Sequence, residues 1–206
     1  MIAKTLLRVV VGGLFAGHGA QKLFGSFGGR GLEETGRTFE RLELRPGREM
    51  AALAGTTELA GGTLVALGAG TPYGAAMLTG VMATAIERAH LRNGPWNGDG
   101  GYEYPLVLMA VLFQLTDSGP GPVSVDRLRG KRHAGPGWAV LELAAGIAGA
   151  MAVRAYSTRR AGREPGSAGQ PDERIPGEPS MAVDARSGER LATSGSAPGG
   201  ARTVAG

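Results

Sequence analysis

The first apolar segment of the chain carries three polar side chains inside a stretch that is otherwise hydrophobic enough for a membrane. His18, Gln21 and Lys22 follow one another at spacings of three and four, which places them on one face of a helix. An ionisable group at membrane depth costs roughly 3 kcal/mol on insertion scales unless it finds a partner. This face therefore predicts a helical bundle in which it points inward, towards partners supplied by later segments.

The composition excludes several classes of function. The 206 residues contain no cysteine, which rules out disulfides, thiol chemistry and cysteine-ligated iron–sulfur or zinc sites. The formal net charge is +4, but the basic residues are scattered and rarely lie beside aromatic ones, so the chain is not expected to bind nucleic acid. Arginines flanking apolar segments are better explained by lipid headgroups and membrane topology.

The apolar segments predict an all-α membrane bundle, with four helices in its core and a fifth transmembrane helix after them. The first segment is about the 20 residues that a bilayer crossing needs. Its Gly13 and Gly17 either form a surface that another helix can approach closely or reflect only that glycine is common in transmembrane helices. The short turn at 68–72 makes the second and third helices an antiparallel hairpin. The expected helices cover residues 2–24, 49–68, 73–90, 104–117 and 138–153.

Two stretches of the chain are too polar to cross a membrane. Residues 25–48 place Leu32, Phe39, Leu42 and Leu44 on one side of a short helix, which predicts an amphipathic connector on the membrane surface or over the end of the bundle. Residues 157–206 are rich in Gly, Pro, Ser and Arg without periodicity and predict a disordered tail. Periodicity alone leaves a soluble helical bundle as the alternative.

Four motifs resemble the DoxX family of small bacterial and archaeal membrane proteins. They are Arg8 with the Leu14–Phe24 segment, the Gly28–Thr35 connector, the Glu-Leu-Ala-Gly-Gly run that begins at Glu58, and the Asn93–Pro105 loop. The resemblance covers roughly residues 4–130 and implies a four-helix membrane bundle over residues 1–130. The basic connector and fifth helix at 131–156 and the tail at 157–206 depart from this pattern.

The resemblance also implies a function. The family takes its name from a subunit associated with quinone-linked thiosulfate oxidation, and some members are linked to membrane complexes that handle oxidative stress. It implies a multi-pass protein of a prokaryotic cytoplasmic membrane, whose partners are the bilayer, other redox subunits and, as a further candidate, a second copy of the chain. No catalytic residue set comes with the resemblance.

The expected helix directions bring the polar residues together. The helices at 2–24 and 73–90 cross in the same direction, so their ends meet on one side, where the helix at 104–117 begins. Lys22 could then pair with Glu87 or Glu58, and Arg88 with Glu103, which would offset most of the cost of burying these charges. The candidate site residues are His18, Gln21, Lys22, Glu58, Glu87, His90 and Glu103.

This cluster has a structural and a functional interpretation. The structural one is an ion-pair network that fixes helix register. The functional one is a pocket for a quinone, with His18, Gln21 or Lys22 donating to a carbonyl and Glu58 exchanging a proton. Haem between His18 and His90 is a weaker alternative, and we expect no metal and no covalently bound cofactor. A non-catalytic membrane adaptor and, less favoured, a small-solute carrier are the competing functions.

Overall fold

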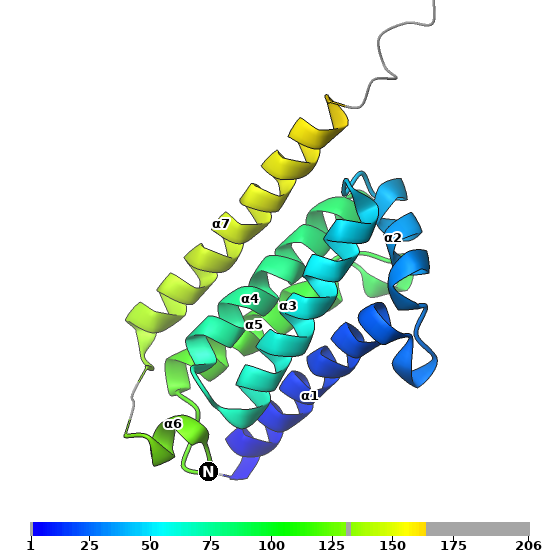
Figure 1. Ribbon diagram of the computed structural model, residues 1–206. Coiled ribbons are helices and arrows are strands. Elements are labelled where there is room, and N and C mark those ends of the chain that lie inside the picture. Colours follow the sequence, from blue (N-terminus) through cyan, green and yellow to red (C-terminus); the bar gives the residue numbers. More distant parts are fainter. Residues whose placement is uncertain (1, 131–132, 164–206) are drawn as a thin grey trace, which may run out of the picture. The chain divides into compact units, whose positions relative to one another are not determined.

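The computed structural model describes residues 2–130 and 133–163, which are helical wherever they form regular structure (Figure 1). Predictions that concern residues 131–132 and 164–206 lie outside the described residues. Five helices are long, and two, α2 and α6, are short; 3-10 and π turns join them at several points. The helices are α1 (Ile2–Phe24), α2 (Gly31–Arg41), α3 (Gly47–Leu67), α4 (Thr71–Ala85), α5 (Glu103–Ser118), α6 (Val125–Leu128) and α7 (Pro136–Ala161).

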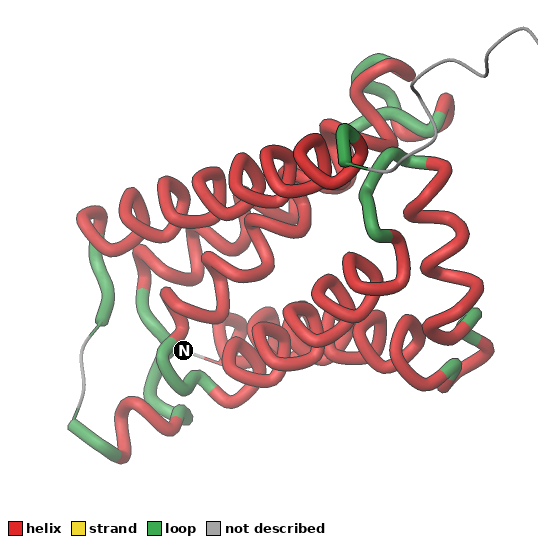
Figure 2. Tube along the Cα trace, turned by 45° about the horizontal axis from the view of Figure 1, so that its top comes forward, coloured by secondary structure: helices red, strands yellow, loops and turns green. Residues whose placement is uncertain are grey.

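The long helices run up and down, with their connections gathered at two ends (Figure 2). Helix α1 has the predicted bounds, and α3 and α5 begin and end within two residues of the predicted ones. The turn between α3 and α4 is tight because Gly68 and Gly70 adopt left-handed conformations, at φ 62° and 63°. Glycine reaches this region without steric cost. The predicted antiparallel hairpin is therefore present.

Helices α1 and α3 pack closely through glycines (Figure 1). A Cβ placed on Gly12 would lie 2.5 Å from the backbone oxygen of Gly62, and the reverse holds for Gly62 and Gly12. The prediction that Gly13 and Gly17 form this surface is wrong, because no atom lies within 4 Å of a Cβ placed on either. The glycine spacing identified a close approach of two helices but placed it on the wrong face of α1.

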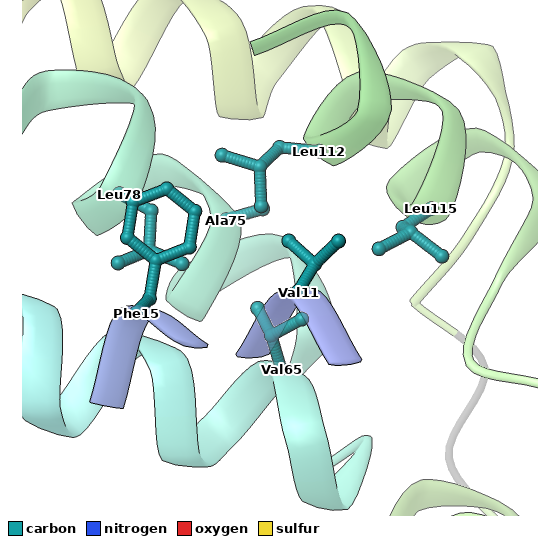
Figure 3. Close-up of a cluster of buried hydrophobic side chains, with 7 residues drawn as sticks. All are labelled: Val11, Phe15, Val65, Ala75, Leu78, Leu112 and Leu115. Atoms are coloured by element: carbon teal, nitrogen blue, oxygen red, sulfur yellow. The ribbon is translucent and has the colours of Figure 1, made fainter. Parts of the chain in front are cut away.

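A hydrophobic cluster joins α1, α3, α4 and α5 (Figure 3). Burial of apolar surface contributes about 25 cal/mol per Å² relative to water. In a membrane protein the same side chains mainly supply close packing, since lipid tails are as apolar as they are. The cluster consists of Val11, Phe15, Val65, Ala75, Leu78, Leu112 and Leu115.

Near the N-terminal end of α1, the side chain of Arg8 binds the connection between α5 and α6. Its side chain is 2% exposed and donates to the carbonyl oxygens of Pro120 (2.7 Å) and Val123 (2.6 Å). Asp126, also buried, accepts from the backbone N–H of Gly70 at 2.8 Å. The start of α4 is thereby capped from α6, a helix that the sequence did not predict.

Three predicted boundaries need correction. The helix expected over 73–90 is α-helical only to Ala85, and residues Ile86–His90 form a π turn. The amphipathic connector contains α2, which ends at Arg41 and not at Pro46. Leu42 and Leu44, which follow α2 in the connector, do turn inward. Helix α7 extends to Ala161, eight residues beyond the predicted end, so the tail cannot begin at 157.

Two of the described helices, α3 and α7, are long and apolar enough to cross a membrane. Helix α1 has 23 residues but carries Lys4, Arg8 and Lys22. Among the described residues, many large apolar side chains of α1, α5 and α7 face outward, for example Leu6 at 61%, Leu106 at 51% and Leu141 at 62% exposed. Such outward faces are expected where lipid is the surrounding solvent.

Candidate functional site

A cavity of about 640 Å³ opens between the long helices on the side where α1 and α4 end. Side chains of α1, α3, α4, α5, α7 and the α2–α3 connection line it, and most of them are apolar. A mostly apolar pocket of this size with a few convergent polar groups is the usual form of a small-molecule site. Its polar residues are His18, Lys22, Thr57, Glu58, Thr84, Arg88, His90, Asn97 and Tyr104.

The strongest polar contact in the cavity wall is the ion pair of Lys22 and Glu58. Lys22 Nζ lies 2.5 Å from Glu58 Oε2, and the side chains are 25% and 4% exposed. Close packing of α1 on α3 sets this distance, since a Cβ on Gly55, one turn before Glu58, would lie 3.3 Å from Lys22 Cβ. Glu58 is therefore the acid that Lys22 contacts, rather than Glu87.

The two histidines in the cavity wall have one ring nitrogen engaged. His90 Nδ1 lies 2.7 Å from the carbonyl oxygen of Gly100, and His18 Nδ1 lies 2.9 Å from Gln21 Oε1. A carbonyl oxygen only accepts, so Nδ1 is the donor in both rings. In the neutral imidazole the remaining nitrogen, Nε2, is then an acceptor, and it is the atom left for a ligand.

Three of the predicted site residues do not line the cavity. Gln21 supports His18, as described above, while Glu87 forms an ion pair with Arg154 of α7 at 3.0 Å. Glu103 accepts from the backbone N–H of Asn97 at 3.0 Å and so braces the loop before α5. The expected convergence of seven residues is thus limited to His18, Lys22, Glu58 and His90.

The predicted pairing of Arg88 with Glu103 is wrong. Arg88 Nη1 lies 3.3 Å from Glu43 Oε2, on the connection between α2 and α3. This contact depends on the path of residues 42–46 over the ends of α3 and α4, which periodicity does not specify. The π turn at Ile86–His90 also changes which way its side chains point, because its hydrogen bonds span five residues.

A second buried carboxyl lies outside the cavity wall. Glu142 of α7 is 3% exposed, and Thr79 Oγ1 of α4 donates to its Oε1 at 2.5 Å. Sequence reasoning noted Glu142 only as the single acid of its segment. An acid in an otherwise apolar helix was the available signal, but the partner on α4 required the fold.

The cavity has polar groups at two depths. Gly61 of α3 lies against Gly74 and Leu78 of the antiparallel α4, so Glu58 lies near the level of Thr79. Arg88 follows roughly nine residues later, which is about 13 Å along the axis at 1.5 Å per residue. We call the region around Lys22 and Glu58 the deep end of the cavity, and the region around Arg88 and His90 its mouth.

Comparison with known proteins finds a family that is similar to the first part of this helical core. Residues 3–91 match the family model DoxX, a span that includes α1 to α4, the π turn and three cavity residues of the deep end, His18, Lys22 and Glu58. No curated protein and no solved structure gives a match. Residues 3–91 are thus similar to the DoxX family, and the two helices long and apolar enough to cross a membrane, with the outward-facing apolar side chains, support a membrane protein.

Proposed function

We propose that this protein binds a quinone in the cavity, as the membrane subunit of a quinone-linked redox or oxidative-stress complex. The observation that carries the proposal is the convergence of His18, Lys22, Glu58 and His90 on one largely apolar cavity. Resemblance to the DoxX family suggested such a role, and the cavity supplies a place for it.

The cavity fits a quinone in size and chemistry. A ring with two carbonyl groups and an apolar tail needs an apolar volume with a few polar groups, and about 640 Å³ lies within the usual range for such ligands. Lys22 has two N–H groups beyond its bond to Glu58, so it can donate to a carbonyl oxygen. The histidine Nε2 atoms can accept from a hydroxyl.

The residues have separate roles in this proposal. A quinone supplies two-electron, two-proton chemistry when bound. Lys22 orients a carbonyl oxygen of the quinone and holds the Glu58 carboxylate in place. Glu58 exchanges a proton with the bound quinone. His90, held by Gly100, takes or returns a proton at Nε2, nearer the mouth and the water outside. The apolar side chains of the cavity wall keep water away from the ring and tail of the bound quinone.

The experiment is purification in mild detergent, followed by extraction and quantification of quinone. We then expect a short-chain quinone to bind the purified protein. His18→Ala should lose most of this binding with little change in stability, because the one hydrogen bond of its ring within the described residues is the exposed pair with Gln21 on the same helix. His133→Ala is the matched control, since His133 contacts Tyr73 and Trp138 and does not line the cavity. Equal binding by all three proteins would contradict the proposal.

A membrane adaptor without catalysis is the second candidate. The absence of cysteine favours it, because electrons would have to enter and leave through partner subunits. An adaptor would copurify with redox proteins whether or not His18, Lys22 and Glu58 are intact. A quinone-linked subunit would keep its partners in these variants but lose the quinone.

We further propose that all five long helices cross the cytoplasmic membrane of a prokaryote. The protein should then stay in the membrane fraction after carbonate washing and need detergent for release. Recovery of a soluble monomer would refute this topology.

A further inference from the structure

We propose that Arg88 forms an anion subsite at the mouth of the cavity, for the carboxylate or phosphate headgroup of a single-chain amphiphile whose tail occupies the apolar part. The inference goes beyond the proposed function, because it requires the cavity but not a quinone. It rests on the burial of Arg88, on the charges around it and on the form of the cavity.

Arg88 is half-buried, and its guanidinium group has few partners among the described residues. The side chain is only 14% exposed, and its contact with a carboxylate is the 3.3 Å contact with Glu43, which is 75% exposed. In the described part of the chain Nε is buried and has no hydrogen-bond partner. Arginine carries five N–H donors and does not lose its charge in proteins, so these donors need an acceptor.

The cavity wall does not supply that acceptor. Among the described residues that line this cavity Glu58 is the only acidic one, and Lys22 engages it at the deep end, about 13 Å from Arg88 along the axis of α4 and the π turn. Lys22 and Glu58 cancel, so the lining itself carries the positive charge of Arg88, which is offset by Glu43, an exposed residue outside the lining. An anionic group placed at the mouth would supply the acceptor that the buried Nε lacks, beside the contact of Nη1 with Glu43.

Simple snorkelling of Arg88 to the membrane surface does not account for its position. A snorkelling arginine keeps its charged end in water and buries only its methylene groups. Arg88 instead has a buried Nε and lies in the cavity wall, as do Leu42 and Leu44 of the α2–α3 connection. The neighbouring Glu87 pairs with Arg154 of α7, so it does not supply an acceptor for Arg88.

The remaining wall suits a hydrocarbon tail. Met77, Val81 and Leu108 line the cavity from α4 and α5, and Gly149 leaves room on the side of α7, where no atom lies within 4 Å of a Cβ placed on it. A long tail can therefore extend from the mouth towards the deep end. The preferred ligand class is a fatty acid or an alkyl phosphate, and a neutral alcohol of the same length should bind more weakly, through its tail alone.

The test compares three probes of equal chain length in nanodiscs of phosphatidylcholine. Radiolabelled hexadecanoate, hexadecyl phosphate and hexadecanol are measured for saturable binding to the full chain. We expect the two anions to bind, and Arg88→Gln to weaken them about ten- to hundred-fold, the usual effect of losing a hydrogen bond to a charged group. Arg88→Lys should recover part of the affinity, and hexadecanol binding should be unchanged.

Arg92→Gln is the matched control, because Arg92 is exposed, lies four residues later and does not line the cavity. It should bind all probes as the unchanged protein does. Retained hexadecanol binding shows that Arg88→Gln is folded. Equal losses for hexadecanoate and hexadecanol, or none in Arg88→Gln, would overturn the proposal. A quinone titration on the same samples separates the two ideas, since loss of quinone binding with intact binding of the anions refutes only the proposed function.

Discussion

Replacing Lys22 by methionine tests the deep end of the cavity directly. Methionine keeps the length of the side chain and removes its charge, so Glu58 would remain buried without its cation. The carboxylate is 4% exposed and the 2.5 Å contact with Lys22 Nζ is the only hydrogen bond recorded for its side chain in the described residues. We expect the free energy of unfolding to fall.

The structure sets the size of this loss. Removing one partner of a buried ion pair costs on the order of 3–5 kcal/mol. Lys22 is one-quarter exposed, so water can reach its end of the pair, and we expect the lower value, about 3 kcal/mol. The double variant Lys22→Met with Glu58→Gln should regain at least about 1 kcal/mol, because no lone charge is left behind.

The assay is reversible unfolding in mixed micelles, followed by circular dichroism. Arg30→Met serves as the control, because Arg30 pairs with Glu34 at 3.6 Å on an exposed surface of α2 and should change stability by less than about 1 kcal/mol. Glu87→Gln combined with Lys22→Met should bring no recovery, since Glu87 pairs with Arg154. If Lys22→Met costs no more than the control, or if Glu87→Gln rescues it, the assignment of the pair is refuted.

Four further substitutions test the packing and the buried hydrogen bonds. Gly12→Val should prevent α1 from seating on α3 and cost about 3 kcal/mol or more, while Gly13→Val, with no atom near its Cβ, should be tolerated, as thermal unfolding would show. Arg8→Gln should release the α5–α6 connection and raise its cleavage rate in limited proteolysis, because two carbonyls lose their donor. Thr79→Val should cost about 1–3 kcal/mol through the lost hydrogen bond to Glu142, and an unchanged unfolding midpoint would argue against that contact.

The sequence by itself determined the elements and their order. Apolar segments bounded by glycine and proline specify helices locally, which is why α1 begins and ends as predicted and the α3–α4 turn needs Gly68 and Gly70. The i, i+3, i+4 spacing of His18, Gln21 and Lys22 also identified an inward polar face. Two of these three residues, His18 and Lys22, do line the cavity.

Only the tertiary structure decided which polar groups meet. From helix periodicity alone, Lys22 could pair with Glu58 or Glu87. The close approach of α1 to α3 selects Glu58. The π turn and the path of residues 42–46 send Arg88 to Glu43 and away from Glu103, and they leave its Nε buried at the mouth of the cavity. Periodicity describes one helix at a time, whereas pairing depends on rotation, register and irregular turns, which are set by how several helices pack together.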